Sequence, residues 1–311
     1  MVFQSTLKNT VRCTGIGLHG GQKTYLSLKP APENSGIVFV RSDLDGARVP
    51  AHVTNVVDTR LCTTLANEEG VKVSTVEHLL AAFAGLGVDN AIVELDGPEV
   101  PIMDGSAAPF VFLIQCAGVM DQQAPKRWIR IKKRVTVKDG DKQARLEPGD
   151  GFDMQFLLDY DHPLLKKQRV GIHLSETTFI KEVSRARTFG FVKEVEYLQA
   201  NGLAQGASLN NAIAIGDYQI LNEDGLRYDD EFARHKLMDA LGDLYLLGTP
   251  ILGKFFGERS GHGLNNTLLR ALLAQADAWE LVEGETHAEA KALDFAPIPG
   301  TGMAAPLSAL S

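Results

Sequence analysis

The chain has 311 residues, of which 44% are hydrophobic and 23% are charged, and its formal net charge at pH 7 is −8. This length and composition are those of a globular protein with room for two domains, and they exclude an intrinsically disordered chain. The negative net charge, without a long run of Lys and Arg, argues against a nucleic-acid-binding protein and against adhesion to an anionic membrane.

The cysteines are odd in number and widely spaced, with no CxxC pair: Cys13, Cys62 and Cys116. This pattern is typical of a reducing compartment rather than of a disulfide scaffold. The first residues contain no apolar stretch of signal-peptide length, and no segment approaches the roughly 20 apolar residues of a membrane span. We therefore expect a cytoplasmic protein without stable membrane insertion.

The first half of the chain begins with short strands and turns. Residues 10–40 alternate between β-branched or aromatic segments and turn residues, which predicts a small antiparallel sheet. Four glycines surround His19 between positions 15 and 21, and they indicate a tight loop or a close approach of the backbone. His19 in this loop is either a hydrogen-bonded structural histidine or a ligand or catalyst.

A helix is predicted between Ser74 and Gly85. Ser74 and Glu77 have the spacing of a capping box, in which the Glu side chain returns to the backbone amide of the cap residue. The alternative is chemical, because Glu77 directly precedes His78. An acid beside a metal ligand at the start of a helix can serve as a general base.

A strand at 90–95 and a helix at 107–117 follow this helix. Residues 121–126 are polar and include a proline, and they predict a linker. The linker divides the chain into an N-terminal domain at 1–122 and a C-terminal domain at 127–295.

The second half repeats the order of the first half. Each half contains strands, a helix that carries a histidine (His78 or His235), a glycine, a further strand, a Gly-containing turn and a second helix. The repetition predicts an α+β fold built from a duplicated unit. The last residues, 296–311, are rich in Pro, Gly, Ala and Ser and predict a flexible tail.

The second half also contains an insertion at about 184–230. In this insertion Phe189 and Phe191 stand beside small residues, and they are followed by a predicted helix at 192–200 and a predicted strand at 212–215. The insertion is either a hydrophobic patch under a loop or a lid over an apolar ligand.

The segment 231–248 predicts a helix that ends with Gly and Pro. On this helix His235, Asp239 and Asp243 are four residues apart and share one face. A His and an Asp one turn apart can chelate a divalent ion, although an exposed His–Asp pair is the simpler alternative. With His78 added, two histidines, one carboxylate and a free fourth position have the composition of a catalytic zinc site.

Six motifs together resemble the UDP-3-O-acyl-N-acetylglucosamine deacetylases, the zinc amidases of the lipid A pathway. The motifs are Ser74–Leu79, Val100–Ser106, Ser184–Phe191, Leu221–Arg227, His235–Tyr245 and Ser260–His262. The resemblance covers about residues 1–295. It implies an α+β fold of two similar domains, each with an insertion, in which helices pack between β-sheets and the active site lies at the domain junction.

The resemblance also implies a reaction and a cofactor. The N-acetyl group of UDP-3-O-(3-hydroxyacyl)-N-acetylglucosamine would be hydrolysed to acetate and a free 2-amine, by a monomer with one zinc ion per chain. Iron is an alternative that this ligand set also suits. The zinc ligands would be His78, His235 and Asp239.

The remaining site residues follow from the same resemblance. Glu77 would be the general base for water, and His262 would be the general acid, held by Asp243. Thr188 and Lys236 would contact the oxyanion or the substrate.

The family pattern further implies substrate contacts. Arg259 would bind the diphosphate, Phe189 would stack on the sugar, and Phe191 would line an acyl-chain passage formed by 184–230. We also expect His19 to contact the substrate. Two alternatives stay open: a different sugar deacetylase, and a non-catalytic module in which a metal ion holds the domains together.

Overall fold

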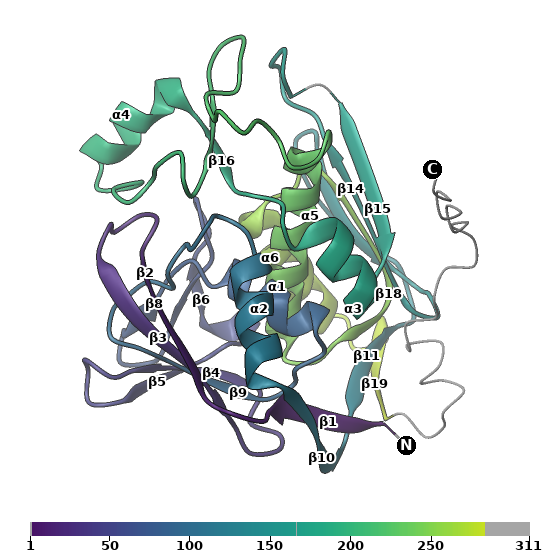
Figure 1. Ribbon diagram of the computed structural model, residues 1–311. Coiled ribbons are helices and arrows are strands. Elements are labelled where there is room, and N and C mark those ends of the chain that lie inside the picture. Colours follow the sequence, from purple (N-terminus) through teal and green to yellow (C-terminus); the bar gives the residue numbers. More distant parts are fainter. Residues whose placement is uncertain (1, 166, 284–311) are drawn as a thin grey trace, which may run out of the picture.

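The computed structural model describes residues 2–165 and 167–283, so the predicted tail and the last part of the predicted C-terminal domain lie outside the described residues. Figure 1 shows a layer of helices between two β-sheets. None of the helices in the described ranges is long and apolar enough to cross a membrane.

The first sheet has five strands in the order β2-β3-β9-β4-β5. The central strand β9 pairs antiparallel with β3 and parallel with β4. Alternate side chains of β3 are buried, as expected for a sheet with one face against a core. The strands are β2 (Val11–Ile16), β3 (Lys23–Pro30), β4 (Ile37–Arg41), β5 (Ala47–Pro50) and β9 (Ala91–Leu95).

The second sheet repeats this arrangement. Its central strand β18 pairs antiparallel with β13 and parallel with β14, and β12 and β15 flank these two. Two further strands, β11 and β19, extend the sheet. The strands are β11 (Arg127–Ile131), β12 (Val135–Asp139), β13 (Lys142–Glu147), β14 (Phe152–Leu158), β15 (Gln168–His173), β18 (Ile251–Glu258) and β19 (Trp279–Glu283).

The helices occupy equivalent places in the two halves. In each half one helix precedes the central strand and one follows it, which confirms the predicted duplication. Figure 1 shows these four helices together in the middle layer. They are α1 (Glu77–Gly85) and α2 (Ala108–Ala117) in the first half, and α5 (Glu231–Leu244) and α6 (His262–Leu273) in the second. A 3₁₀ turn (Tyr245–Leu247) continues α5 and ends at Gly248, whose φ of 77° is left-handed.

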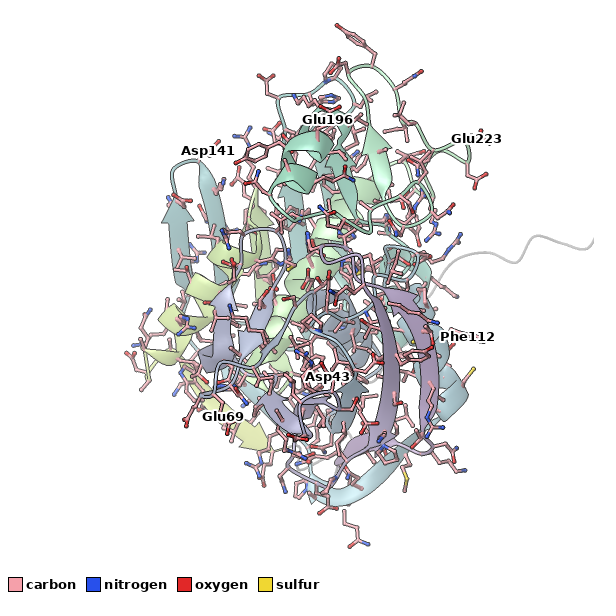
Figure 2. All side chains as sticks on the ribbon, turned by 90° about the vertical axis from the view of Figure 1, so that its left-hand side faces the viewer. Asp43, Glu69, Phe112, Asp141, Glu196 and Glu223 are labelled. Carbon is pink, nitrogen blue, oxygen red and sulfur yellow. The ribbon has the colours of Figure 1, made fainter. Side chains whose placement is uncertain are left out.

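Each half carries an insertion. The first insertion follows a 3₁₀ turn (Val53–Asn55) in the sequence and forms a three-stranded sheet. Its strands are β6 (Val56–Asp58), β7 (Thr64–Ala66) and β8 (Lys72–Val73). The second follows α3 (Glu176–Thr178) and a π-helical turn (Phe179–Val183), and consists of β16 (Phe189–Phe191), α4 (Val192–Ala200) and β17 (Ile213–Ile215). The predicted helix at 192–200 is confirmed. Figure 2 shows Glu196 and Glu223, from this insertion, at the end of the molecule where Asp141 marks the tip of the β12–β13 hairpin.

The predicted linker at 121–126 is wrong. These residues belong mainly to β10 (Val119–Pro125), which pairs antiparallel with β1 (Phe3–Leu7). The polar side chains mark a hydrogen-bond network rather than a flexible segment. Gln122 accepts a hydrogen bond from the buried Asn90 amide and donates one to the carbonyl of Ala31.

Helices α1 and α5 cross at Gly242, where a Cβ atom would lie 2.0 Å from the backbone carbonyl oxygen of Glu77. We predict that Gly242→Ala separates the two helices and lowers the free energy of unfolding by about 1–3 kcal/mol, the usual cost of overpacking. Denaturant titration measures this change. Gly190→Ala, whose added Cβ meets open space, is the control. Equal stability of the two variants would contradict the close crossing.

Candidate metal centre and active site

Three candidate ligand side chains meet where α1 and α5 cross. His78 lies on α1, and His235 and Asp239 lie one turn apart on α5. Their ligand atoms are all within 4.8 Å of one another, and all three residues are buried. The Nε2 atoms of His78 and His235 are each 3.4 Å from Asp239 Oδ1. Ligand atoms about 2.0–2.2 Å from one tetrahedral ion lie roughly 3.3–3.6 Å apart, so the spacing suits a metal ion.

The hydrogen bonds of these side chains also fit a metal ion. His235 Nδ1 lies 3.2 Å from the carbonyl oxygen of Ala186, which assigns the proton to Nδ1 and leaves Nε2 as a ligand atom. Burial lowers the pKa of His235 to about 3, so the ring is neutral. Asp239 Oδ1 is buried and has no hydrogen-bond partner among the described residues, as a ligand oxygen would.

Lys236 lies beside this cluster. Its Nζ donates a hydrogen bond to Asp239 Oδ2 at 2.8 Å, which leaves Oδ1 for the cluster. Burial alone would raise the pKa of Asp239, but its closeness to His235 and to the Lys236 ammonium group outweighs burial and holds the pKa well below the usual range. The carboxylate is therefore charged, as a metal ligand must be.

Glu77 is the first residue of α1, and the predicted capping box is wrong. The N-cap residue is Val76, and no side chain caps the helix. The Glu77 carboxylate turns inward instead, where its Oε2 accepts a hydrogen bond from the N–H of Thr63 at 3.0 Å. Burial raises the pKa of Glu77, which brings the carboxylate closer to the range of a general base at neutral pH.

His262, the first residue of α6, faces Glu77 across the cluster. Its Nε2 is 3.9 Å from Glu77 Oε1, and its Nδ1 is 2.9 Å from Asp243 Oδ2. Burial alone would lower the pKa of His262, but Asp243 and Glu77 outweigh it and raise the pKa to about 9. The ring is therefore a proton donor at neutral pH.

Two residues of this site have no counterpart in the sequence analysis. Thr63 donates its hydroxyl to Asp243 Oδ1 at 2.6 Å and its N–H to Glu77, and Asn265 donates to Asp243 Oδ2 at 2.9 Å. Asn265 lies one helical turn after His262, a spacing that could have identified it. Thr63 comes from the first insertion and carries no local signal.

The insertion brings other candidate residues to the metal cluster. The ring centroid of Phe189 is 6.0 Å from the ring centroid of His235. The preceding residue, Thr188, donates its backbone N–H to the carbonyl oxygen of Gly105. Phe191 is farther along β16 and packs against Tyr160, which also contacts Phe189.

Arg259 directly follows β18, three residues before His262. Arg259 has a φ of 51°, and its guanidinium pairs with Asp141 and Asp159. Both ring nitrogens of His19 are buried without a hydrogen-bond partner among the described residues, so His19 is not a structural histidine of the hydrogen-bonded kind.

A buried His–His–Asp cluster with a separate carboxylate and imidazole beside it is the arrangement of a metal-dependent hydrolase. Residues 4–274 match the model of the UDP-3-O-acyl N-acetylglycosamine deacetylase family, and the chain belongs to this family.

Curated relatives agree with this match. The UDP-3-O-acyl-N-acetylglucosamine deacetylase of Teredinibacter turnerae is 60% identical over 285 residues, 91% of this chain and 94% of the relative. The enzymes of the same name from Hahella chejuensis and Acidithiobacillus ferrooxidans are each 58% identical. The first covers 96% of this chain and 99% of the relative, and the second covers 91% and 94%.

Proposed function

We propose that this protein hydrolyses the N-acetyl group of UDP-3-O-(3-hydroxyacyl)-N-acetylglucosamine, releasing acetate and the free 2-amine as the committed step of lipid A biosynthesis. The buried cluster of His78, His235 and Asp239 between Glu77 and His262 is the observation that carries this proposal. Family membership supports the substrate.

The cluster would hold one zinc ion, with iron as the alternative. A bound ion would polarise the acetamide carbonyl and increase the acidity of water. Glu77 removes the proton from the attacking water, and Thr63 keeps its carboxylate in place. His262 donates a proton to the departing amine, because an amine cannot leave as an anion.

The oxyanion of the tetrahedral intermediate needs hydrogen-bond donors. The Thr188 hydroxyl is one, and Lys236 is a second, since its ammonium group lies beside the ligand Asp239. Attraction to Asp239 raises the pKa of Lys236 above its usual range although burial opposes this, so the group stays charged.

The insertion at 184–230 forms the passage for the acyl chain in this proposal. The partly buried Phe191 supplies apolar surface, the buried Ile213 and Ile215 of the neighbouring strand β17 lie beside it, and each methylene of the acyl chain buried there contributes about 0.8 kcal/mol. Phe189 stacks on the sugar next to His235, and His19 contacts the substrate from the opposite side.

Arg259 binds the diphosphate in this proposal. Its guanidinium is one-third exposed and pairs with the carboxylates of Asp141 and Asp159, which a diphosphate would replace.

The division of the chain into two domains is also part of the proposal. The N-terminal domain would comprise residues 1–122, and the C-terminal domain residues 127–295. We further propose a cytoplasmic monomer. The three free cysteines support a reducing compartment.

Metal removal tests this proposal. We predict that chelation abolishes acetate release from the UDP-3-O-acyl substrate, and that about one equivalent of zinc restores it. Thermal denaturation of the same samples should show a lower melting temperature after chelation, because the two ligand helices lose their common ligand. A metal-replete protein that releases no acetate would contradict the proposal and favour a metal-held binding module.

A further inference from the structure

We infer that Glu99 is a positioning residue for substrate binding, which holds the loop at 17–21 against the turn at 204–206 of the insertion. This inference rests on the proposed function. Glu99 follows β9 and lies outside the catalytic groups described above.

The Glu99 carboxylate is 5% exposed and satisfied by hydrogen bonds. Its Oε1 accepts from the N–H of His19 at 2.8 Å and from the hydroxyl of Thr75 at 2.9 Å, and its Oε2 accepts from the N–H of Gly20 at 2.8 Å. Among the described residues no Lys or Arg forms an ion pair with it. A buried carboxylate of this kind depends on these donors, so its position and that of the loop are coupled.

The surrounding backbone is shaped around this carboxylate. A Cβ atom at Gly17 would lie 2.3 Å from Glu99 Oε2, so only glycine fits there. Thr75 has a φ of 58°, a costly conformation for a β-branched residue, and its hydroxyl reaches Glu99 from it. Because Thr75 is two residues before Glu77, the same carboxylate connects the loop to the start of α1.

The loop in turn contacts the insertion. The N–H groups of Gln205 and Gly206 donate to the carbonyl oxygens of His19 and Leu18, at 3.1 and 3.0 Å. A Cβ atom at Gly206 would lie 2.2 Å from the carbonyl oxygen of Gly17. The loop therefore holds the part of the insertion around Gln205 and Gly206.

The same loop carries His19, whose two ring nitrogens are buried without a hydrogen-bond partner among the described residues. Burial lowers the pKa of His19, Glu99 partly opposes this, and His262 adds to the lowering. A displaced loop would thus disturb the His19 ring and the insertion directly, whereas among the described residues the loop forms no hydrogen bond with the metal cluster, Glu77 or His262.

Glu99→Gln tests this inference in the full-length metal-replete protein. The glutamine side chain has the shape of the carboxylate. Its NH₂ group, however, is a donor at a position where a carboxylate oxygen accepts a hydrogen bond from an N–H or O–H group. We expect KM for the acylated substrate to rise about fivefold or more, with kcat within about twofold of wild type and unchanged metal content. Glu94→Gln, in the half-exposed pair with Lys29 on β9, is the matched control.

Hydrogen exchange gives a readout that does not depend on activity. In Glu99→Gln the amides of Gln205 and Gly206 should exchange about tenfold faster, while the Thr188 amide, at the base of the insertion, keeps its wild-type rate. If wild type releases no acetate, the proposed function fails, and the exchange rates still decide whether Glu99 holds the insertion.

Gly206→Ala disturbs the same contact from the insertion side and decides the question if Glu99→Gln does not fold. The same rise in KM supports the inference. A folded Gly206→Ala protein with the wild-type KM overturns the inference. A Glu99→Gln protein also overturns it if kcat and metal content fall together while the amides of Gln205 and Gly206 stay protected from exchange.

Discussion

Glu77→Gln is expected to lower kcat by about 10²–10⁴-fold, the usual contribution of a general base. The amide oxygen of glutamine can still accept the hydrogen bond from the N–H of Thr63, so the side chain should keep its place. It cannot accept a proton from water, however. KM should change little, because in the proposed mechanism Glu77 acts on the water and makes its contribution in the transition state.

Steady-state kinetics of acetate release, together with metal analysis of the same sample, measure this effect. Glu69→Gln, an exposed glutamate in the turn between β7 and β8, controls for the change in net charge. A Glu77→Gln protein that binds metal and keeps kcat within tenfold of wild type would remove Glu77 from the role of base. Loss of the metal would make Glu77 a ligand.

The duplicated fold could be predicted from the sequence because its signals are local. The helix ends at Gly85 and Gly248 are marked by glycine, and the order of strands and helices repeats around His78 and His235. The predicted ends of the insertion helix at 192–200 agree with the structure for the same reason, because its signals are also local.

The errors occur where tertiary contacts overrule a local pattern. Ser74 and Glu77 have the spacing of a capping box, but the buried Glu77 carboxylate accepts a hydrogen bond from the N–H of Thr63 instead of capping the helix. Residues 121–126 resemble a linker in composition, yet pairing with β1 makes them a strand.

The support of the site could not be predicted, because it is non-local. Thr63 reaches Asp243 across 180 positions of the chain, and Glu99 reaches the loop around Gly20 across 79. Neither residue belongs to a motif whose chemistry suggests a role. The closeness of the candidate ligands His235 and Asp239 could be predicted because an i, i+4 pair on a helix is visible in sequence, whereas the residues that orient them are defined by packing.

His262→Ala is the second large effect, with an expected loss in kcat of about 10²–10⁴-fold and little change in metal content. In the proposed mechanism the imidazolium is the proton donor to the departing amine, and alanine leaves none. The half-exposed His173, which pairs with Asp153 on the second sheet far from the cluster, is the matched control as His173→Ala. Retention of kcat in His262→Ala would assign the proton transfer to another group.

Asp243→Asn tests how this histidine is held. In the wild-type protein the Asp243 carboxylate accepts hydrogen bonds from His262 and Asn265, whereas the NH₂ group of asparagine is itself a donor. The His262 ring therefore loses the partner that stabilises its positive charge. We expect a loss in kcat smaller than that of His262→Ala. If Asp243 acts through His262, the double variant should be no slower than His262→Ala alone, because the second substitution removes nothing further from the reaction. Additive losses would instead place the main contribution of Asp243 in its hydrogen bond with Thr63, and through Thr63 in the position of Glu77.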